Sequence, residues 1–151
     1  MMADMAQPLD PRVEIGRVRL HVADLDRAVA FYTGVLGFDV TQRVGTAAAY
    51  LGAGGFHHHI ALSASNGARG PGDLPSRFSI RFPDRVALAN ALRRLDESNV
   101  APLRSEDDGV SEGLFVRDPD GNEIELYIDV PGVDWKSDPA LIGAPIRPLV
   151  L

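Results

Sequence analysis

Apolar and polar residues alternate in two segments of the chain, residues 17–24 (RVRLHVAD) and residues 77–84 (RFSIRFPD). The apolar positions are Val18, Leu20 and Val22 in the first segment and Phe78, Ile80 and Phe82 in the second. A period of two is typical of a strand that buries one face and exposes the other. Both segments begin with Arg and end with Asp, so the pattern predicts a duplicated unit.

A helix is expected after each of these strands, because Asp24 and Asp84 can accept hydrogen bonds from the free N–H groups of a first helical turn. The first helix is apolar at helical spacing and can end at Gly37. Three more strands follow each helix, at 38–44, 47–51 and 57–62 in the first half and at 101–102, 114–117 and 123–128 in the second. The sequence therefore predicts an α+β protein made of two βαβββ modules.

Composition narrows the class of protein. With 151 residues, 45% hydrophobic and 24% charged, the chain is long enough for one core and too short for two independent ones. It has no cysteine, which excludes disulfides and thiolate metal sites and fits a reducing cytoplasm. A net charge of −6 argues against a nucleic-acid partner, and neither a membrane-spanning apolar run nor a signal peptide is visible. We expect a cytoplasmic protein that binds neither nucleic acid nor membrane.

The chain divides into three parts. Residues 1–12 are expected to form a mobile N-terminal arm, and residues 13–130 the paired-module domain. The parts of that domain are module one at 13–63, a linker rich in Gly, Pro, Ser and Asn at 64–75, and module two at 76–130. The tail 131–151 carries Trp135, Leu141 and Ile146, which are too apolar for a free end. We expect the tail to pack on its own domain or on a second subunit, in a homodimer.

Several motifs together resemble a known group of proteins. The phrases HVADLDRAVAFYTGVLGF and DPDGNEIELY are similar to the vicinal oxygen chelate superfamily of glyoxalases, bleomycin-resistance proteins and extradiol ring-cleaving dioxygenases. The segments GGFHHHIAL and DDGVSEGLFVRDPDGNEIELY resemble most closely its small catechol 2,3-dioxygenase-like branch. The resemblance covers residues 13–130. It implies curled mixed sheets around a cavity, helices on the outer faces, and a divalent metal on the polar face of the cavity.

Most of the metal-ligand positions that the resemblance implies hold residues that cannot bind a metal. Ring-cleaving members use two His and one Glu. Glu125 fills the carboxylate position, whereas Arg17 and Arg77 stand where His is expected, and Ala61 stands at the remaining position. A guanidinium has no lone pair to donate and repels a cation. Two further positions of the dioxygenase signature also differ, Asp108 in place of a His and Phe115 in place of a Tyr. We therefore expect neither a metal nor another cofactor.

Strand alternation indicates which side chains share the cavity face with these positions. The expected ligand-binding residues are Arg17, Arg19, His21, His57, His59, Arg77, Arg81, Glu123, Glu125 and Tyr127. Four Arg against two Glu would make this wall positive in an acidic protein, which favours a small anionic or aromatic ligand. At least one of Arg17 and Arg77 is expected to bond Glu125. The candidates for a catalytic role are His57, His59 and Tyr127.

Several functions remain open on the sequence. The favoured hypothesis is a glyoxalase- or dioxygenase-like protein with a degenerate metal site, which binds a small anionic or aromatic molecule without metal. The alternatives are a metal-dependent ring-cleaving dioxygenase or glyoxalase-type lyase, and a metal-independent isomerase or cyclase with His57 or His59 as general base. A relocated metal site of His57, His59 and Glu125 has suitable ligand chemistry. Structural interpretations also stand, since the three His can simply end a strand and DPDG is a turn signal.

Overall fold

The computed structural model describes residues 7–65 and 75–149, and its elements follow the order βαβββ twice. Module one contains β1 (Val18–Val22), α1 (Leu25–Ala30), the π-helical turn η1 (Phe31–Val35), β2 (Asp39–Val44), β3 (Ala48–Gly52) and β4 (Ile60–Ala64). Module two contains β5 (Arg77–Arg81), α2 (Arg85–Glu97), β6 (Arg104–Asp107), β7 (Ser111–Arg117) and β8 (Glu123–Asp129). A 3-10 turn, η2 (Pro139–Leu141), follows in the tail. The predicted repeat is confirmed, although β4 begins later than residue 57 and β6 lies after residues 101–102.

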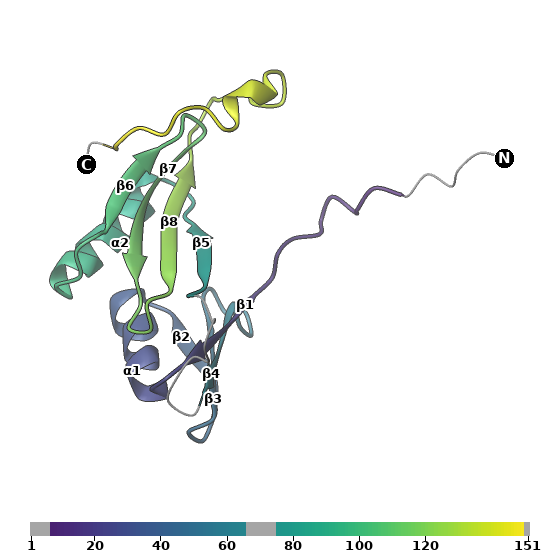
Figure 1. The fold of residues 1–151 in the computed structure, drawn as a ribbon. Coiled ribbons are helices and arrows are strands. Elements are labelled where there is room, and N and C mark those ends of the chain that lie inside the picture. Colours follow the sequence, from purple (N-terminus) through teal and green to yellow (C-terminus); the bar gives the residue numbers. More distant parts are fainter. Residues whose placement is uncertain (1–6, 66–74, 150–151) are drawn as a thin grey trace.

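The strands form two four-stranded mixed sheets, in the orders β1-β4-β3-β2 and β5-β8-β7-β6. In each sheet the first and last strands of the module pair in parallel, and the other neighbours pair antiparallel. Figure 1 shows the two sheets one after the other along the molecule, with α1 and α2 on the same side of them. Each sheet therefore has one face covered by a helix and one open face. This is the α+β architecture that the sequence predicts.

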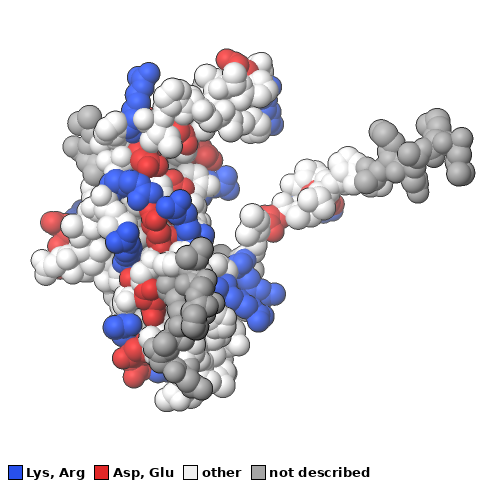
Figure 2. Space-filling view, in the orientation of Figure 1, with Lys and Arg blue, Asp and Glu red and all other residues white. Residues whose placement is uncertain are grey.

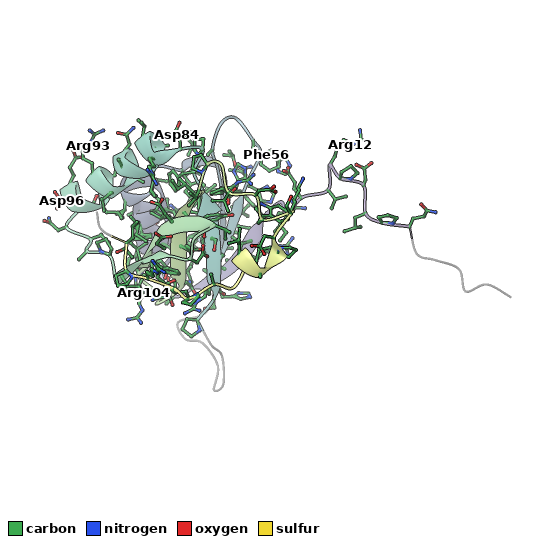
Figure 3. The ribbon with its side chains drawn as sticks, turned by 90° about the horizontal axis from the view of Figure 1, so that it is seen from above. Arg12, Phe56, Asp84, Arg93, Asp96 and Arg104 are labelled. Atoms are coloured by element: carbon green, nitrogen blue, oxygen red, sulfur yellow. The ribbon has the colours of Figure 1, made fainter. Side chains whose placement is uncertain are left out.

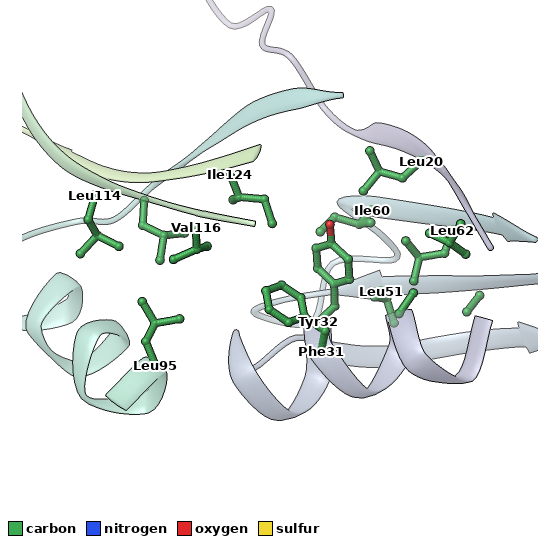
Figure 4. Packing of buried hydrophobic residues seen from close by; sticks show 14 of the residues in the cluster. Leu20, Phe31, Tyr32, Leu51, Ile60, Leu62, Leu95, Leu114, Val116 and Ile124 are labelled. Carbon is green, nitrogen blue, oxygen red and sulfur yellow. The ribbon is translucent and has the colours of Figure 1, made fainter. Parts of the chain in front are cut away.

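Apolar residues of both modules meet in one core between the helices and the covered faces of the sheets (Figure 4). On β1 the side chains of Leu20 and Val22 are buried and those of Arg19 and His21 are exposed, as the alternation predicts. Burial of a Leu or Val side chain stabilises the fold by about 1.5–3 kcal/mol. The core thereby fixes which face of each strand stays open to solvent.

The predicted helix caps are present. The Asp24 carboxylate accepts a hydrogen bond from the Arg27 N–H at 3.0 Å, and the Asp84 carboxylate accepts one from the Ala87 N–H at 2.8 Å. After η1 the chain turns at Gly37, whose φ of 91° lies in the left-handed region that favours glycine. The duplicated caps set the point where strand gives way to helix in both modules.

The DPDG turn also joins the two modules. Asp118 is buried, and its carboxylate accepts hydrogen bonds from the backbone N–H groups of Asp120 and Asn122, both at 2.9 Å. The Tyr32 hydroxyl of η1 donates to the same carboxylate at 2.7 Å. Burial, and then the negative charge of Asp118, raise the pKa of Tyr32, so the phenol keeps its proton. The sequence predicted the turn but did not reveal this contact with module one.

A second contact between the modules comes from Arg94 of α2. Its guanidinium donates to backbone carbonyls at the end of η1, those of Thr33 at 3.4 Å, Gly34 at 3.2 Å and Val35 at 3.4 Å. Carbonyls at a helix C-terminus carry partial negative charge, so a cation stabilises them. Arg94 is therefore part of the framework of the fold.

Both ends of the described chain leave apolar side chains uncovered. Leu9, Val13 and Ile15 are exposed, and Figure 1 shows the N-terminal segment running away from the body. The tail pairs with β6 at one bridge, between Asp107 and Arg147. Its exposed apolar residues are Trp135, Leu141, Ile142 and Ile146. The tail thus packs only partly on its own domain.

Residues 1–6, 66–74 and 150–151 lie outside the described part of the chain. Most of the predicted linker 64–75 and part of the predicted arm 1–12 fall in these ranges. Within the ranges that the structure describes, no helix is long and apolar enough to cross a membrane.

Candidate functional site

The open face of the first sheet is hollowed. A pocket of about 480 Å³ lies there, lined by Arg17, Arg19, Thr41, Gln42, Tyr50, His57 and His58. These side chains come from the start of module one, from β2 and β3, and from the turn before β4. No residue in this described lining is acidic. Figure 2 shows a group of basic side chains at the foot of the N-terminal segment, where β1 begins.

Strand register places the residues of this pocket side by side. Arg19 lies opposite Ala61 in the parallel pair β1/β4, and Ala61 lies opposite Tyr50 in the antiparallel pair β3/β4. Ala61 is buried, so an implied ligand position offers only a methyl group between an Arg and a Tyr. The register of β2 shifts at an irregularity before Gln42, and the adjacent Thr41 and Gln42 both line the pocket. A regular strand would turn two adjacent side chains to opposite faces.

Residues 53–59, here called the histidine turn, bring imidazoles to this face. Gly52 makes the turn possible, because a Cβ at that position would collide with the backbone carbonyl of Phe56. Only glycine permits such a close approach between two backbone segments. The Ala53 N–H then donates to the Nδ1 of His59 at 3.2 Å, which ties the two ends of the turn together.

His58 contacts Arg17, His57 and Tyr50 in the pocket. Its Nε2 lies 3.0 Å from the Nη1 of Arg17, and its Nδ1 lies 2.9 Å from the Nδ1 of His57. The ring of Tyr50 meets the His58 ring edge-on, with centroids 5.0 Å apart. Desolvation, followed by the positive charge of Arg17, lowers the pKa of His58. The arrangement therefore favours the neutral imidazole.

Sequence reasoning missed His58, and the reason is a strand boundary. The alternation rule selected His57 and His59 because it assumed a strand from residue 57. The strand begins at Ile60, so all three His stand in a turn, where side chains do not alternate between two faces. The half-buried His59 stacks with Phe56, with ring centroids 4.7 Å apart, and is absent from the described lining of the pocket. The hydrogen bond between His58 and Arg17 could not be predicted from the sequence pattern.

The open face of the second sheet carries ion pairs instead of a positive pocket. Arg77 donates to Glu123 at 2.8 Å, and Arg104 approaches the other oxygen of Glu123 at 2.5 Å. Arg104 also donates to Glu106 at 3.0 Å, and Arg81 donates to Asp129 at 3.3 Å. The hydrogen bond from Arg77 is the main cause that lowers the pKa of Glu123. Charges on this face therefore compensate one another.

The expected bond between Glu125 and Arg17 or Arg77 is wrong. Glu125 accepts a hydrogen bond from the Ser79 hydroxyl at 2.8 Å, while Arg77 bonds Glu123 and Arg17 bonds a histidine. Register explains the outcome, because Arg77 lies directly opposite Glu123 and Ser79 lies opposite Glu125. The two arginines thus have separate partners in separate modules.

The remaining predicted site residues also divide between the two faces. His21 is exposed on β1 opposite Ser63, outside the described lining of the pocket. Tyr127 lies between Arg81 and Gly113 on the second sheet, and burial raises the pKa of its hydroxyl. Of the ten predicted ligand-binding residues, the first-sheet pocket brings together Arg17, Arg19 and His57.

The other positions of the dioxygenase signature have structural partners. Asp108 accepts hydrogen bonds from the backbone N–H groups of Val110 and Ser111 at 3.0 and 2.7 Å, so it closes a turn. Phe115 is buried, and the guanidinium of Arg104 lies 3.9 Å from its ring centroid. Across residues 7–65 and 75–149, no three His, Asp or Glu side chains gather in a group that could hold a metal ion.

A second hollow, of about 690 Å³, lies beside the C-terminal half of α2 and includes Leu92, Arg93 and Asp96. Figure 3 shows Arg93 and Asp96 on the side of the molecule away from Phe56 of the histidine turn. It is the larger hollow, but it carries both charge signs and none of the predicted site residues. The first-sheet pocket is therefore the better candidate for a functional site.

Comparison with known proteins places this chain in a family. Residues 14–126 match the glyoxalase/bleomycin resistance protein/dioxygenase superfamily. The chain belongs to this superfamily. A catechol-2,3-dioxygenase of Bacillus subtilis (strain 168) is 37% identical over 131 residues, which make up 82% of this chain and 44% of that protein. A biphenyl-2,3-diol 1,2-dioxygenase 3 of Rhodococcus globerulus is 30% identical over 148 residues, with 87% of this chain and 76% of that protein covered.

Solved structures support the same fold. A lactoylglutathione lyase from Agrobacterium tumefaciens is 21% identical with a TM-score of 0.64, over 79% of this chain and 96% of that one. A glyoxalase/bleomycin resistance protein/dioxygenase from Alicyclobacillus acidocaldarius is also 21% identical, with a TM-score of 0.61, over 80% and 93% of the two chains. At this identity the similarity establishes the fold and no activity. The present superfamily member spans less than half the length of the B. subtilis relative.

Proposed function

We propose that this superfamily member binds a small anionic molecule, such as an aromatic carboxylate, on the open face of its first sheet and without a metal. The observation that carries the proposal is the pocket lining, which combines two Arg and two His with no acidic residue among the described residues. A carboxylate fits such a site because a guanidinium can donate two parallel hydrogen bonds to it. The ring of Tyr50 offers an aromatic surface beside these donors.

Arg19 is the residue that we assign to the anion. It is exposed on β1, and within the described residues it has no ion pair. Arg17, in contrast, already bonds His58. A guanidinium without a carboxylate partner attracts a small anion here, because no acidic residue of the described pocket lining offsets its charge.

The donor set at the family's metal positions supports a metal-free mode of binding. Arg17 and Arg77 cannot donate a lone pair, Ala61 has no donor atom, and Glu125 is left as a single carboxylate. One carboxylate among guanidinium groups does not meet the ligand requirements of a divalent transition metal. The inherited metal site is therefore degenerate in this proposal.

Calorimetric titration with benzoate tests the binding site. The Arg19→Ala variant is expected to bind benzoate about tenfold more weakly, the effect of losing one charge-assisted hydrogen bond. Arg93→Ala is the matched control, since Arg93 bonds Asn90 on the outer side of α2 and lies far from the pocket. Added salt should weaken binding in the wild type, because it screens contacts between an anion and exposed Arg. Equal affinities for Arg19→Ala and Arg93→Ala would remove the site assignment.

A metal titration tests the second half of the proposal. Fe(II), Mn(II), Ni(II) or Zn(II) should leave benzoate affinity unchanged and should not bind at one ion per chain. The relatives include enzymes named for catechol and for a biphenyl diol, so cleavage of catechol should be assayed together with the metal titration. Metal-dependent cleavage, or an ion coordinated by Glu125, would overturn the metal-free assignment in favour of a ring-cleaving dioxygenase.

A homodimer is part of the proposal. Exposed apolar side chains stand at both ends of the described chain, and Ile15 is fully exposed. Uncovered apolar groups of this kind are typical of surfaces that a partner subunit covers. Light scattering at high protein concentration should give twice the mass of one chain, and a monomer there would contradict the assembly.

A further inference from the structure

Three side chains of the pocket form a directional hydrogen-bond chain. The Nη1 of Arg17 lies 3.0 Å from the Nε2 of His58, and the Nδ1 of His58 lies 2.9 Å from the Nδ1 of His57. A guanidinium can only donate, so the Nε2 of His58 must accept. A neutral imidazole that accepts at one nitrogen carries its proton on the other, so the Nδ1 of His58 donates to His57.

The direction of the chain fixes the last proton as well. The Nδ1 of His57 accepts from His58, which leaves the proton of a neutral His57 on its Nε2. This nitrogen has no assigned bond within the described residues, and His57 is an exposed residue of the pocket lining. Its N–H is therefore available to a molecule in the pocket.

We propose that Arg17 and His58 are positioning residues that set the tautomer of His57, so that the His57 Nε2–H donates to the bound oxyanion beside Arg19. This inference rests on the proposed function. It adds His57 as the second hydrogen-bond donor of the site, and it explains why the proton of His57 is on Nε2. The ligand class is a small oxyanion with two acceptor atoms, one for Arg19 and one for His57. Such a pair of donors distinguishes a carboxylate from a halide, which offers a single acceptor centre.

The surroundings favour the neutral form of His58. The charged and titratable groups that face His58 are Arg17, which directly precedes β1, Arg19 from β1, His57 and His59 from the histidine turn, and Tyr50 from β3. Desolvation and the positive charges among them lower the pKa of His58. Protonation of either imidazole would turn an acceptor into a donor and break one bond of the chain.

Nitrogen-15 NMR of the two imidazoles tests the tautomers in the unliganded protein near pH 7.5. His58 should appear as the Nδ1–H tautomer and His57 as the Nε2–H tautomer. The His58→Leu variant should change the His57 signals toward a mixture of tautomers, whereas Arg19→Ala should leave them unchanged. An Nε2–H tautomer at His58 in the wild type would overturn the inference, because that nitrogen could not then accept from Arg17.

Benzoate binding tests the positioning role with a matched pair of variants. His58→Gln keeps one acceptor and one donor, as a neutral imidazole does, whereas His58→Leu keeps neither. We expect benzoate affinity to stay within about twofold in His58→Gln and to fall about fivefold to tenfold in His58→Leu, the range for one hydrogen bond. The urea midpoints of both variants show whether a loss of binding reflects unfolding.

The outcomes separate the inference from the proposed function. If the wild type binds neither benzoate nor inorganic phosphate, the proposed function falls and the donor role of His57 falls with it, whatever the tautomers. If the wild type binds benzoate and both His58 variants bind it as tightly as the wild type does, the proposed function stands and the positioning role is wrong. If His58→Leu binds more weakly and His58→Gln restores the affinity, the positioning role is supported.

Discussion

The turns that lead into the last strand of each module occupy equivalent places in the fold but have different structural roles. In module two, residues 118–122 bury Asp118, which bonds the backbone of its own turn and the hydroxyl of Tyr32 in module one. In module one, residues 53–59 carry three His and leave His57 exposed beside a pocket. One copy of the turn therefore holds the modules together, whereas the other copy leaves polar side chains exposed beside a pocket.

The open sheet faces differ in the same sense. On the second sheet the described Arg side chains Arg77, Arg81 and Arg104 each face a carboxylate. On the first sheet Arg17 faces His58, and the described pocket lining contains no acidic residue. Compensated charges contribute to the stability of the second face, whereas uncompensated charges make the first face attractive to an anion.

The largest expected effect is on the module-two turn. Asp118→Ala should lower the free energy of unfolding by about 3–5 kcal/mol. The substitution removes a buried acceptor and leaves the buried Tyr32 hydroxyl without its hydrogen-bond partner. His58→Ala, in the equivalent turn of module one, should lower the free energy of unfolding much less, as is usual at partly exposed positions. Urea unfolding of both variants measures the difference. Equal losses would mean that both turns support the fold to the same extent.

Gly52 should show that the module-one turn has a defined shape. Gly52→Ala introduces a Cβ that collides with the Phe56 carbonyl, so we expect a loss of about 1–3 kcal/mol and a displaced histidine turn. Benzoate affinity should fall with it. Gly16→Ala is the control, since no atom lies within 4 Å of a Cβ added there. Unchanged benzoate binding in a folded Gly52→Ala protein would argue against any role for the turn in the site.

Glu123 should matter more to stability than Glu125, although the family resemblance implies a ligand position for Glu125. Glu123→Gln is expected to cost about 1–2 kcal/mol, because it leaves Arg77 and Arg104 without their shared carboxylate. Glu125→Gln should cost less, since its assigned partner is the Ser79 hydroxyl. The folded-state pKa of Glu123 lies below the unfolded value of 4.5, so its contribution is present above that pH and is lost as pH falls. Urea midpoints at pH 7 and pH 4 measure both effects.

The smallest expected effect is the pH dependence from His58. Its folded-state pKa lies below the unfolded value of 6.5, so the unfolded chain takes up more protons as pH falls through that value. Stability should therefore decline between pH 7.5 and pH 5.5. The decline should be smaller in His58→Gln, which cannot titrate. An identical pH profile in wild type and His58→Gln would show that His58 has no lowered pKa.

The sequence by itself determined the repeat, the helix caps and the faces of the strands. Alternation of apolar and polar residues separates a buried face from an open one wherever a strand is regular, and Arg19 and His21 on β1 follow that rule. Asp24 and Asp84 cap their helices because capping depends on a residue and its immediate neighbours. These features are local: each depends on residues that are close together in the sequence, so the sequence alone predicts them.

Only the tertiary structure decided which side chains meet. The register of the parallel pair β5/β8 places Arg77 opposite Glu123 and Ser79 opposite Glu125. Packing of the core sets this register between two strands that are far apart in the sequence. The start of β4 at Ile60 places His58 in a turn beside Arg17, where alternation does not apply. Contacts between residues distant in sequence depend on how two faces are packed together, and a one-dimensional pattern does not contain that information.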